Sequence, residues 1–145
     1  MMTVKKTSVF PASKKIVFDK LQKLKTLQYI AYPYATFTPT DVIDEFIWEE
    51  GSSFSFQFKL FGVISLGIHT INVVRFNQDK GIHTNEGNKF VPVWNHEIIL
   101  EKLDELHTKY TDIVNIEAGW KTVVVYLWAK AFYSHRQKKW LKLLK

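Results

Sequence analysis

Two side chains that could exchange protons, His96 and Asp112, lie in segments that alternate between apolar and polar residues like β-strands. Both are in phase with apolar neighbours, so both are expected to point inward. With Glu86 as a third member, they could form an acid–base pair acting on a carbonyl compound. Buried polar groups otherwise hydrogen-bond to one another, to water or to the backbone. Because no nucleophile accompanies them, we expect a structural or ligand-orienting role, with catalysis as the alternative.

The sequence contains no complete motif for a metal site, for nucleotide binding or for a catalytic nucleophile. His96-Glu97 begins like H-E-x-x-H, but residue 100 is leucine, so no zinc site is predicted. Residues 62–67 read G-x-x-S-x-G on a strand-like segment, which is not a nucleophile elbow. No glycine loop precedes a helix and there is no cysteine. We therefore expect neither a metal nor a cofactor. The spacing of the other four histidines favours neither metal binding nor catalysis; they are His69, His83, His107 and His135.

Aromatic residues make up 15% of the 145 residues, and many follow the period of two expected for strands. Residues 53–61 alternate most clearly, with phenylalanine on one face and polar side chains on the other. Residues 92–103 and 109–117 alternate in the same way. The residues expected to point inward from these strands are Phe54, Phe56, Phe58, Trp94, His96, Ile98, Tyr110 and Asp112.

The remaining elements complete a sheet with helices at both ends of the chain. Residues 3–10 form a strand, Ser13 caps a helix over 14–25, and 26–39 form a second short helix and a loop. Further strands are predicted at 42–48, 63–76 and 82–86, with Gly67 marking a bulge or sharp bend. Seven strands joined by short turns must pair antiparallel.

A helix of about 26 residues is predicted from Gly119 to the end. Its first half is apolar nearly all round, so we expect it to be covered on most sides. Its second half is amphipathic, with Trp140 and Leu144 opposite a lysine face. This end could contact an anionic membrane with these two side chains as a wedge. The simpler interpretation is that they pack on the sheet, while the lysines meet the negative end of the helix dipole.

The net charge of +6 is confined to the C-terminal segment. Residues 118–145 contain seven cations and no acid, so the other 117 residues carry thirteen cations against fourteen acids. No stacking platform accompanies the cations, and we expect no specific nucleic-acid site. The sequence shows neither a signal peptide nor a membrane span, which with the lack of cysteine suggests a cytoplasmic protein; weak contact with a membrane surface stays open.

The order of elements resembles the START-like or Bet v 1-like superfamily, which includes polyketide cyclase/dehydratase-like proteins and lipid carriers (SRPBCC). The similarity covers almost the whole chain, but each motif is short and structural. The first strand and helix resemble the family's in Ser8-Val9-Phe10-Pro11-Ala12-Ser13 and Val17-Phe18-Leu21. Further similarities are a W-x-x-G turn at Trp48-Glu49-Glu50-Gly51, a last strand with T-D-x-V at Tyr110-Thr111-Asp112-Ile113-Val114, and a helix end at Ala131-Phe132 with His135-Arg136.

This resemblance implies an α+β helix-grip fold: a single domain over residues 1–145, whose curved seven-stranded sheet and two short helices wrap a long C-terminal helix. It also implies a cavity between that helix and the sheet, holding a small apolar or amphipathic molecule. A cyclase/dehydratase-like enzyme and a membrane- or protein-interaction module are the alternatives, and no oligomeric state is predicted. The expected ligand-binding residues are Phe54, Phe56, Phe58, Trp94, His96, Ile98, Tyr110, Asp112, Val124, Leu127, Trp128 and Ala131.

Overall fold

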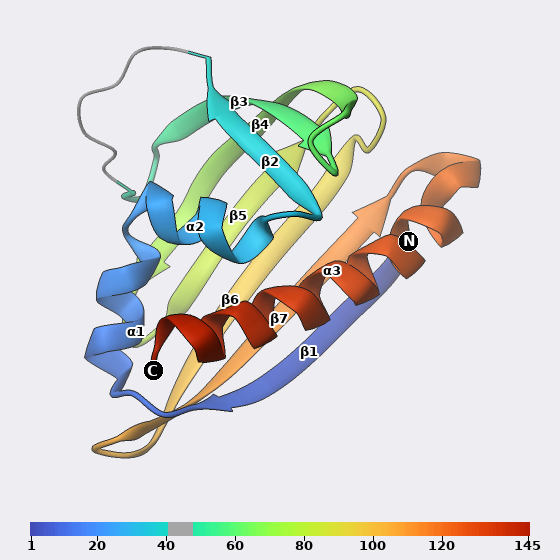
Figure 1. Cartoon of the computed structure of the whole chain (residues 1–145). Helices are drawn as coiled ribbons and strands as arrows, with labels where there is room; N and C mark the ends of the chain where they lie inside the picture. Colours follow the sequence, from blue (N-terminus) through green and yellow to red (C-terminus); the bar gives the residue numbers. More distant parts are fainter. Residues whose placement is uncertain (41–47) are drawn as a thin grey trace.

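The computed structural model describes residues 1–40 and 48–145, and within them one antiparallel sheet faces a long helix (Figure 1). The seven strands lie in the order β1-β7-β6-β5-β4-β3-β2. They are β1 (Met2–Phe10), β2 (Ala35–Pro39), β3 (Ser53–Leu60), β4 (Ile64–Asn77), β5 (Gly81–Gly87), β6 (Val93–Asp104) and β7 (His107–Glu117). The helices are α1 (Lys14–Leu21), α2 (Leu24–Ala31) and α3 (Thr122–Leu143), the last preceded by a 3₁₀ turn, η1 (Gly119–Lys121).

Helix α3 runs along the sheet, packing against β1 and β7, and its C-terminal end lies beside α1 and α2 (Figure 1). The sheet curls around this arrangement, so β2 and β3 stand across from α3 rather than beneath it. The predicted curved antiparallel sheet with a long terminal helix is confirmed.

Irregularities in β4 help the sheet to curl. The pairing of β3 with β4 skips between Gln57 and Lys59, whose partners are Ile68 and Ser65. Gly67 lies in this skip with a φ of 75°, a conformation that costs glycine little. The bulge predicted at this glycine is therefore confirmed, and such bulges bend a strand and increase its twist.

The N-terminal third differs from the sequence prediction in two places. Ser13 caps α1 as expected, accepting a hydrogen bond from the Ile16 amide at 3.2 Å, but the helix ends at Leu21 and a new one begins at Leu24. Residues 35–39, predicted as loop, form the edge strand β2, in which Phe37 pairs with Phe58. The strand predicted at 42–48 lies outside the described residues except for Trp48.

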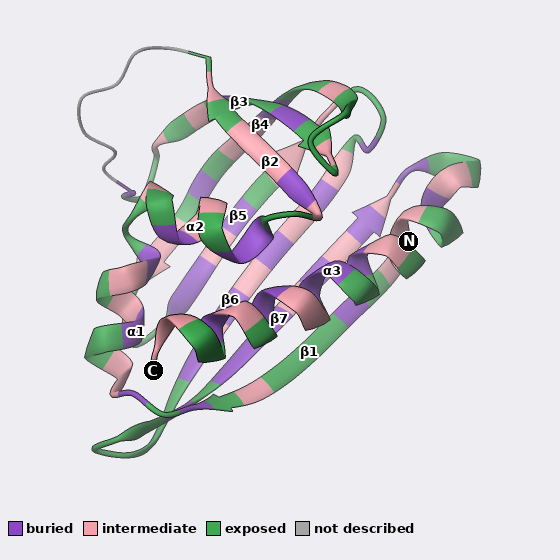
Figure 2. Ribbon diagram, in the orientation of Figure 1, coloured by how far each residue is buried: buried purple, intermediate pink, exposed green. Residues whose placement is uncertain are grey.

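The expectation that the first half of α3 is covered on most sides is wrong. Leu127 is 59% exposed and Val124 67% exposed, and Figure 2 shows exposed residues along the outer side of the helix. The reason is that α3 contacts β1 and β7, with α2 beside its C-terminal end, and no described element lies over its outer side. Its buried side carries Ala129, Phe132, Tyr133 and Arg136, and ends at Trp140.

Trp140 is fully buried, which contradicts its alternative role as a membrane wedge. Its ring stacks on Phe10 at a centroid distance of 5.4 Å and lies 5.7 Å from Tyr110. The amphipathic second half of α3 therefore packs on the sheet, while Lys138 and Lys142 remain exposed. Under the C-terminal half of α3 the side chains are closely packed, whereas the space under its N-terminal half is only partly filled.

Candidate ligand-binding cavity

A cavity of about 250 Å³ lies between α3, the two short helices and strands β3 to β6. Its walls are mainly aliphatic and aromatic. Phe56 and Phe58 contribute from β3, and Trp128 and Phe132 from α3. A separate group of polar residues from β4, β5 and β6 also reaches the wall, so the cavity is apolar with one polar region.

Seven of the twelve residues expected at a ligand site lie on this wall: Phe56, Phe58, Trp94, His96, Ile98, Val124 and Trp128. Five of these lie on β3 and β6 and are predictable because inward positions on a strand recur every second residue. Val124 and Trp128 are four residues apart on α3, and Phe132 continues the same helical face. Their role in binding a ligand stays a prediction.

The other five residues do not lie on the wall. Leu127 and Ala131 are on the exposed side of α3, one position before Trp128 and Phe132 and therefore about 100° away around the helix. Phe54 packs against Trp48, with ring centroids 4.7 Å apart.

Tyr110 and Asp112 do point inward, as their alternation predicted, but the space they face is filled. Tyr110 stacks on Phe10 at 4.6 Å, under the C-terminal half of α3. Asp112 is completely buried and touches His96 instead of the cavity. Strand alternation identifies the side of the sheet, but it does not show which part of that side is left vacant.

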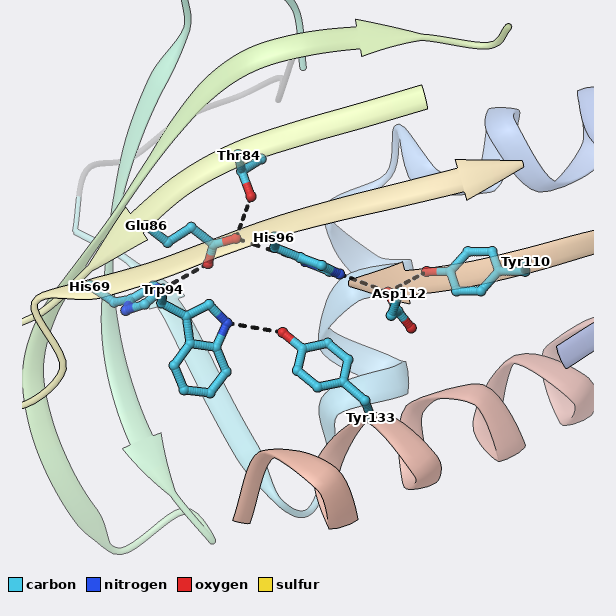
Figure 3. A network of polar contacts seen from close by, with 8 residues as sticks. All are labelled: His69, Thr84, Glu86, Trp94, His96, Tyr110, Asp112 and Tyr133. Carbon is cyan, nitrogen blue, oxygen red and sulfur yellow. Dashed lines mark hydrogen bonds and ion pairs between the residues drawn. The ribbon is translucent and has the colours of Figure 1, made fainter. Parts of the chain in front are cut away.

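Asp112 has a partner for each carboxylate oxygen, and Figure 3 shows two of these partners, His96 and Tyr110. His96 Nε2 lies 2.7 Å from its Oδ1, the Tyr110 hydroxyl donates to the same oxygen at 3.4 Å, and Gln137 Nε2 donates to Oδ2 at 3.0 Å. Gln137 in turn accepts from the Ser8 hydroxyl at 2.5 Å. This network joins β6, β7, β1 and α3, so it fixes the helix on the sheet.

Glu86 forms a second polar group beside the cavity (Figure 3). Its Oε1 lies 2.8 Å from His69 Nε2, and its Oε2 accepts from the Thr84 hydroxyl at 2.5 Å. The same Oε2 is 4.0 Å from His96 Nδ1. The His96 ring therefore lies between two carboxylates. The sequence analysis did not predict that His69 belongs to this site. Its strand is irregular around Gly67, and its partner Glu86 is on another strand.

Both carboxylates are held in the charged form. Burial alone would raise the pKa of Asp112, but the hydrogen bond and charge of His96, together with the charge of Arg136 and the hydrogen bond from Gln137, bring it below its ordinary value. Burial likewise opposes ionisation of Glu86, and the hydrogen bond and charge of His69 lower its pKa overall. Tyr133 is different: burial raises the pKa of its hydroxyl far above the ordinary value, so it stays neutral and accepts a hydrogen bond from Trp94 Nε1 at 3.0 Å.

Comparison with solved structures finds proteins of the same architecture. A START superfamily protein from Mycobacterium smegmatis superposes with a TM-score of 0.71 at 14% identity, over 98% of this chain and 96% of that one. A protein from Chromobacterium violaceum gives 0.74 at 12% identity, over 98% and 96% of the two chains, and Ara h 8.0201, a Bet v 1-like protein, gives 0.63 at 10% identity, over 97% and 98%. The chain has the helix-grip fold. No family model and no curated protein matches the sequence, so the likeness shows the fold alone.

Arg136 is another cavity residue that the sequence analysis did not predict, since it was noted there only as a C-terminal cation and in the family-like end of the helix. It lies four residues after Phe132 on the inner face of α3 and lines the cavity. The spacing Trp128, Phe132, Arg136 could have identified it, since residues four apart share a helical face. No group of three or more potential metal ligands occurs in residues 1–40 and 48–145, and no described helix is long and apolar enough to cross a bilayer.

Proposed function

We propose that the protein binds a small apolar or amphipathic molecule in the cavity under the first half of α3. The observation that carries this proposal is the cavity itself, with mostly apolar walls and one polar region. Ligand sites in proteins share this composition, in which apolar walls supply affinity and a few polar groups fix orientation. START and Bet v 1-like proteins commonly bind ligands, and the shared fold supports a similar role here.

The cavity wall also suggests where a ligand enters. Val124 lines the cavity and is 67% exposed, which means that the opening lies beside the N-terminal half of α3. Well-packed interiors contain few voids larger than a water molecule, so a space of about 250 Å³ leaves many wall atoms without neighbours. An apolar guest would restore those contacts, and this is the physical basis for binding.

Filling the cavity should abolish binding. Val125 lines the wall on α3, whereas Val123 does not and points to solvent. We expect Val125→Trp to weaken binding of an environment-sensitive apolar dye by more than about tenfold, because the indole occupies the space of the guest. Val123→Trp adds the same side chain to the same helix and should leave dye binding unchanged.

Fluorescence titration measures this difference, with circular dichroism confirming that both variants are folded. Equal dye binding by the two variants would place the dye elsewhere and contradict the proposal. Absence of dye binding by the folded wild-type protein would contradict it more directly.

A second candidate function is catalysis on a carbonyl compound, favoured by the position of His96 between Glu86 and Asp112. His96 lies on the cavity wall with a carboxylate on either side of its ring, so the group could transfer protons to and from a bound substrate. If this is the function, a compound that displaces the dye will be converted to product, and His96→Gln will stop conversion while the compound still binds. Mass spectrometry of displacing compounds after incubation decides between binding and turnover, since an unchanged compound supports binding alone.

A further inference from the structure

Arg136 is a buried cation without a polar partner. It is 7% exposed, and neither a hydrogen bond nor an ion pair connects it to any residue in the described part of the chain. The guanidinium instead lies over two aromatic rings of its own helix, those of Phe132 and Tyr133. The guanidinium carbon lies 5.6 Å from the centroid of Phe132 and 5.1 Å from that of Tyr133. These rings hold the guanidinium at the cavity wall and leave its N–H groups unused.

The nearby acids do not supply the missing partner. Asp112 is already engaged with His96, Tyr110 and Gln137. Glu86 is engaged with His69 and Thr84. Both acids act on Arg136 through space and contribute to raising the pKa of its guanidinium, even though burial opposes the charge. The side chain is therefore held charged without forming an ion pair with either carboxylate.

A buried charge normally has a bonded counter-ion, because removing it from water is costly and only close pairing offsets that cost. Arginine presents five N–H donors in a planar fork that matches the two oxygens of a carboxylate. In this chain Arg136 lines a mainly apolar cavity, so a carboxylate partner would have to come from the ligand.

We propose that Arg136 binds the carboxylate of the ligand, so that the cavity selects apolar monocarboxylic acids. This inference rests on the proposed binding function and names its ligand class. A single carboxylate fits better than a phosphate group, because the other basic groups on the described wall, His69 and His96, are already paired with Glu86 and Asp112. One unpaired guanidinium and apolar walls match one charge and an apolar tail.

The test compares decanoate, decanol and decylamine as competitors of the apolar dye at pH 8, where the acid is ionised. The wild-type protein should bind decanoate roughly tenfold to a hundredfold more tightly than decanol, the range expected for hydrogen bonds to a charged group, and should bind decylamine most weakly. This selectivity is measured without any substitution, so it does not depend on the folding of a variant.

Substitution then assigns the selectivity to one residue. Arg136→Met should bind decanoate and decanol equally, and Arg136→Lys should keep part of the preference, because it keeps the charge without the fork. Arg75 is the only other arginine, is half-buried, has a buried Nε without a hydrogen-bond partner, and lies off the cavity wall. Arg75→Met should therefore retain the full preference for decanoate.

The outcomes separate this inference from the proposed function. If the wild-type protein binds decanoate and decanol equally, Arg136 does not select acids, while the binding function stands. A preference that survives Arg136→Met, or that disappears in Arg75→Met, also overturns the assignment. If none of the three compounds displaces the dye and the dye itself does not bind, both proposals fail together.

Discussion

Replacing Asp112 by alanine is expected to lower the free energy of unfolding by about 3–5 kcal/mol, the usual effect of breaking a buried ion pair by removing one partner. Asp112 is fully buried and joins His96, Tyr110 and Gln137, so its removal leaves three buried polar groups without their partner. Urea denaturation followed by circular dichroism measures the change. Because the network links α3 to the sheet, we expect the unfolding transition to move without losing cooperativity.

A matched control is available in the same protein. Asp104 also binds a histidine, His107, at 2.9 Å, but both side chains are exposed. Water replaces the lost contact there, and solvent screens the charges, so Asp104→Ala should leave stability nearly unchanged. Similar losses for the two variants would mean that the buried network contributes no more than a surface pair, contrary to its geometry.

The same network predicts a pH dependence. The pKa of Asp112 is lowered in the folded protein from an ordinary value of 3.8, and that of Glu86 from 4.5. A lowered folded pKa means that the unfolded chain takes up the proton first as the pH falls. The stabilisation is therefore complete above these ordinary values and is lost as the pH drops through the folded ones. Asp112→Asn should show a shallower loss of stability between pH 5 and 3 than the wild-type protein, in denaturation curves measured across about that range.

Alternation in the sequence was sufficient to predict much of the sheet and its inner face. His96 is buried beside Trp94 and Ile98, as its phase on β6 required, because a slip of one residue would have exposed all three. The bulge at Gly67 and the cap at Ser13 were also predictable from single residues with strong local preferences. Each of these features is determined by a few residues that are neighbours in the sequence.

The hydrogen-bond and ion-pair partners of the buried polar side chains could not be predicted in the same way. His69 reaches Glu86 from a neighbouring strand, and the skip at Gly67 sets the register that brings them together. The strand β2 was missed for a related reason, since Ala35–Pro39 has no clear alternation and is ordered by pairing with β3. Such contacts depend on the register between strands, which a single sequence does not show.

The one-sided packing of α3 shows why apolar composition did not predict burial. Val123, Val124 and Leu127 are all exposed, although the surrounding sequence is apolar nearly all round. A helix lying on one sheet can bury only the face toward it, whatever the residues on the other face. Burial is therefore decided by the architecture, and two tryptophans of the same segment provide a direct test.

Trp140→Ala is expected to destabilise the protein by about 3–5 kcal/mol, the cost of a large cavity in a packed core. Trp140 is 0% exposed and packs on Phe10 and Tyr110, whereas Trp120 is 88% exposed in the turn before α3. Trp120→Ala removes the same atoms from the surface and should change stability by less than about 0.5 kcal/mol. Thermal and urea unfolding of the two variants measure the contrast. If Trp120→Ala proved as damaging as Trp140→Ala, the exposed side of α3 would have to be covered in solution.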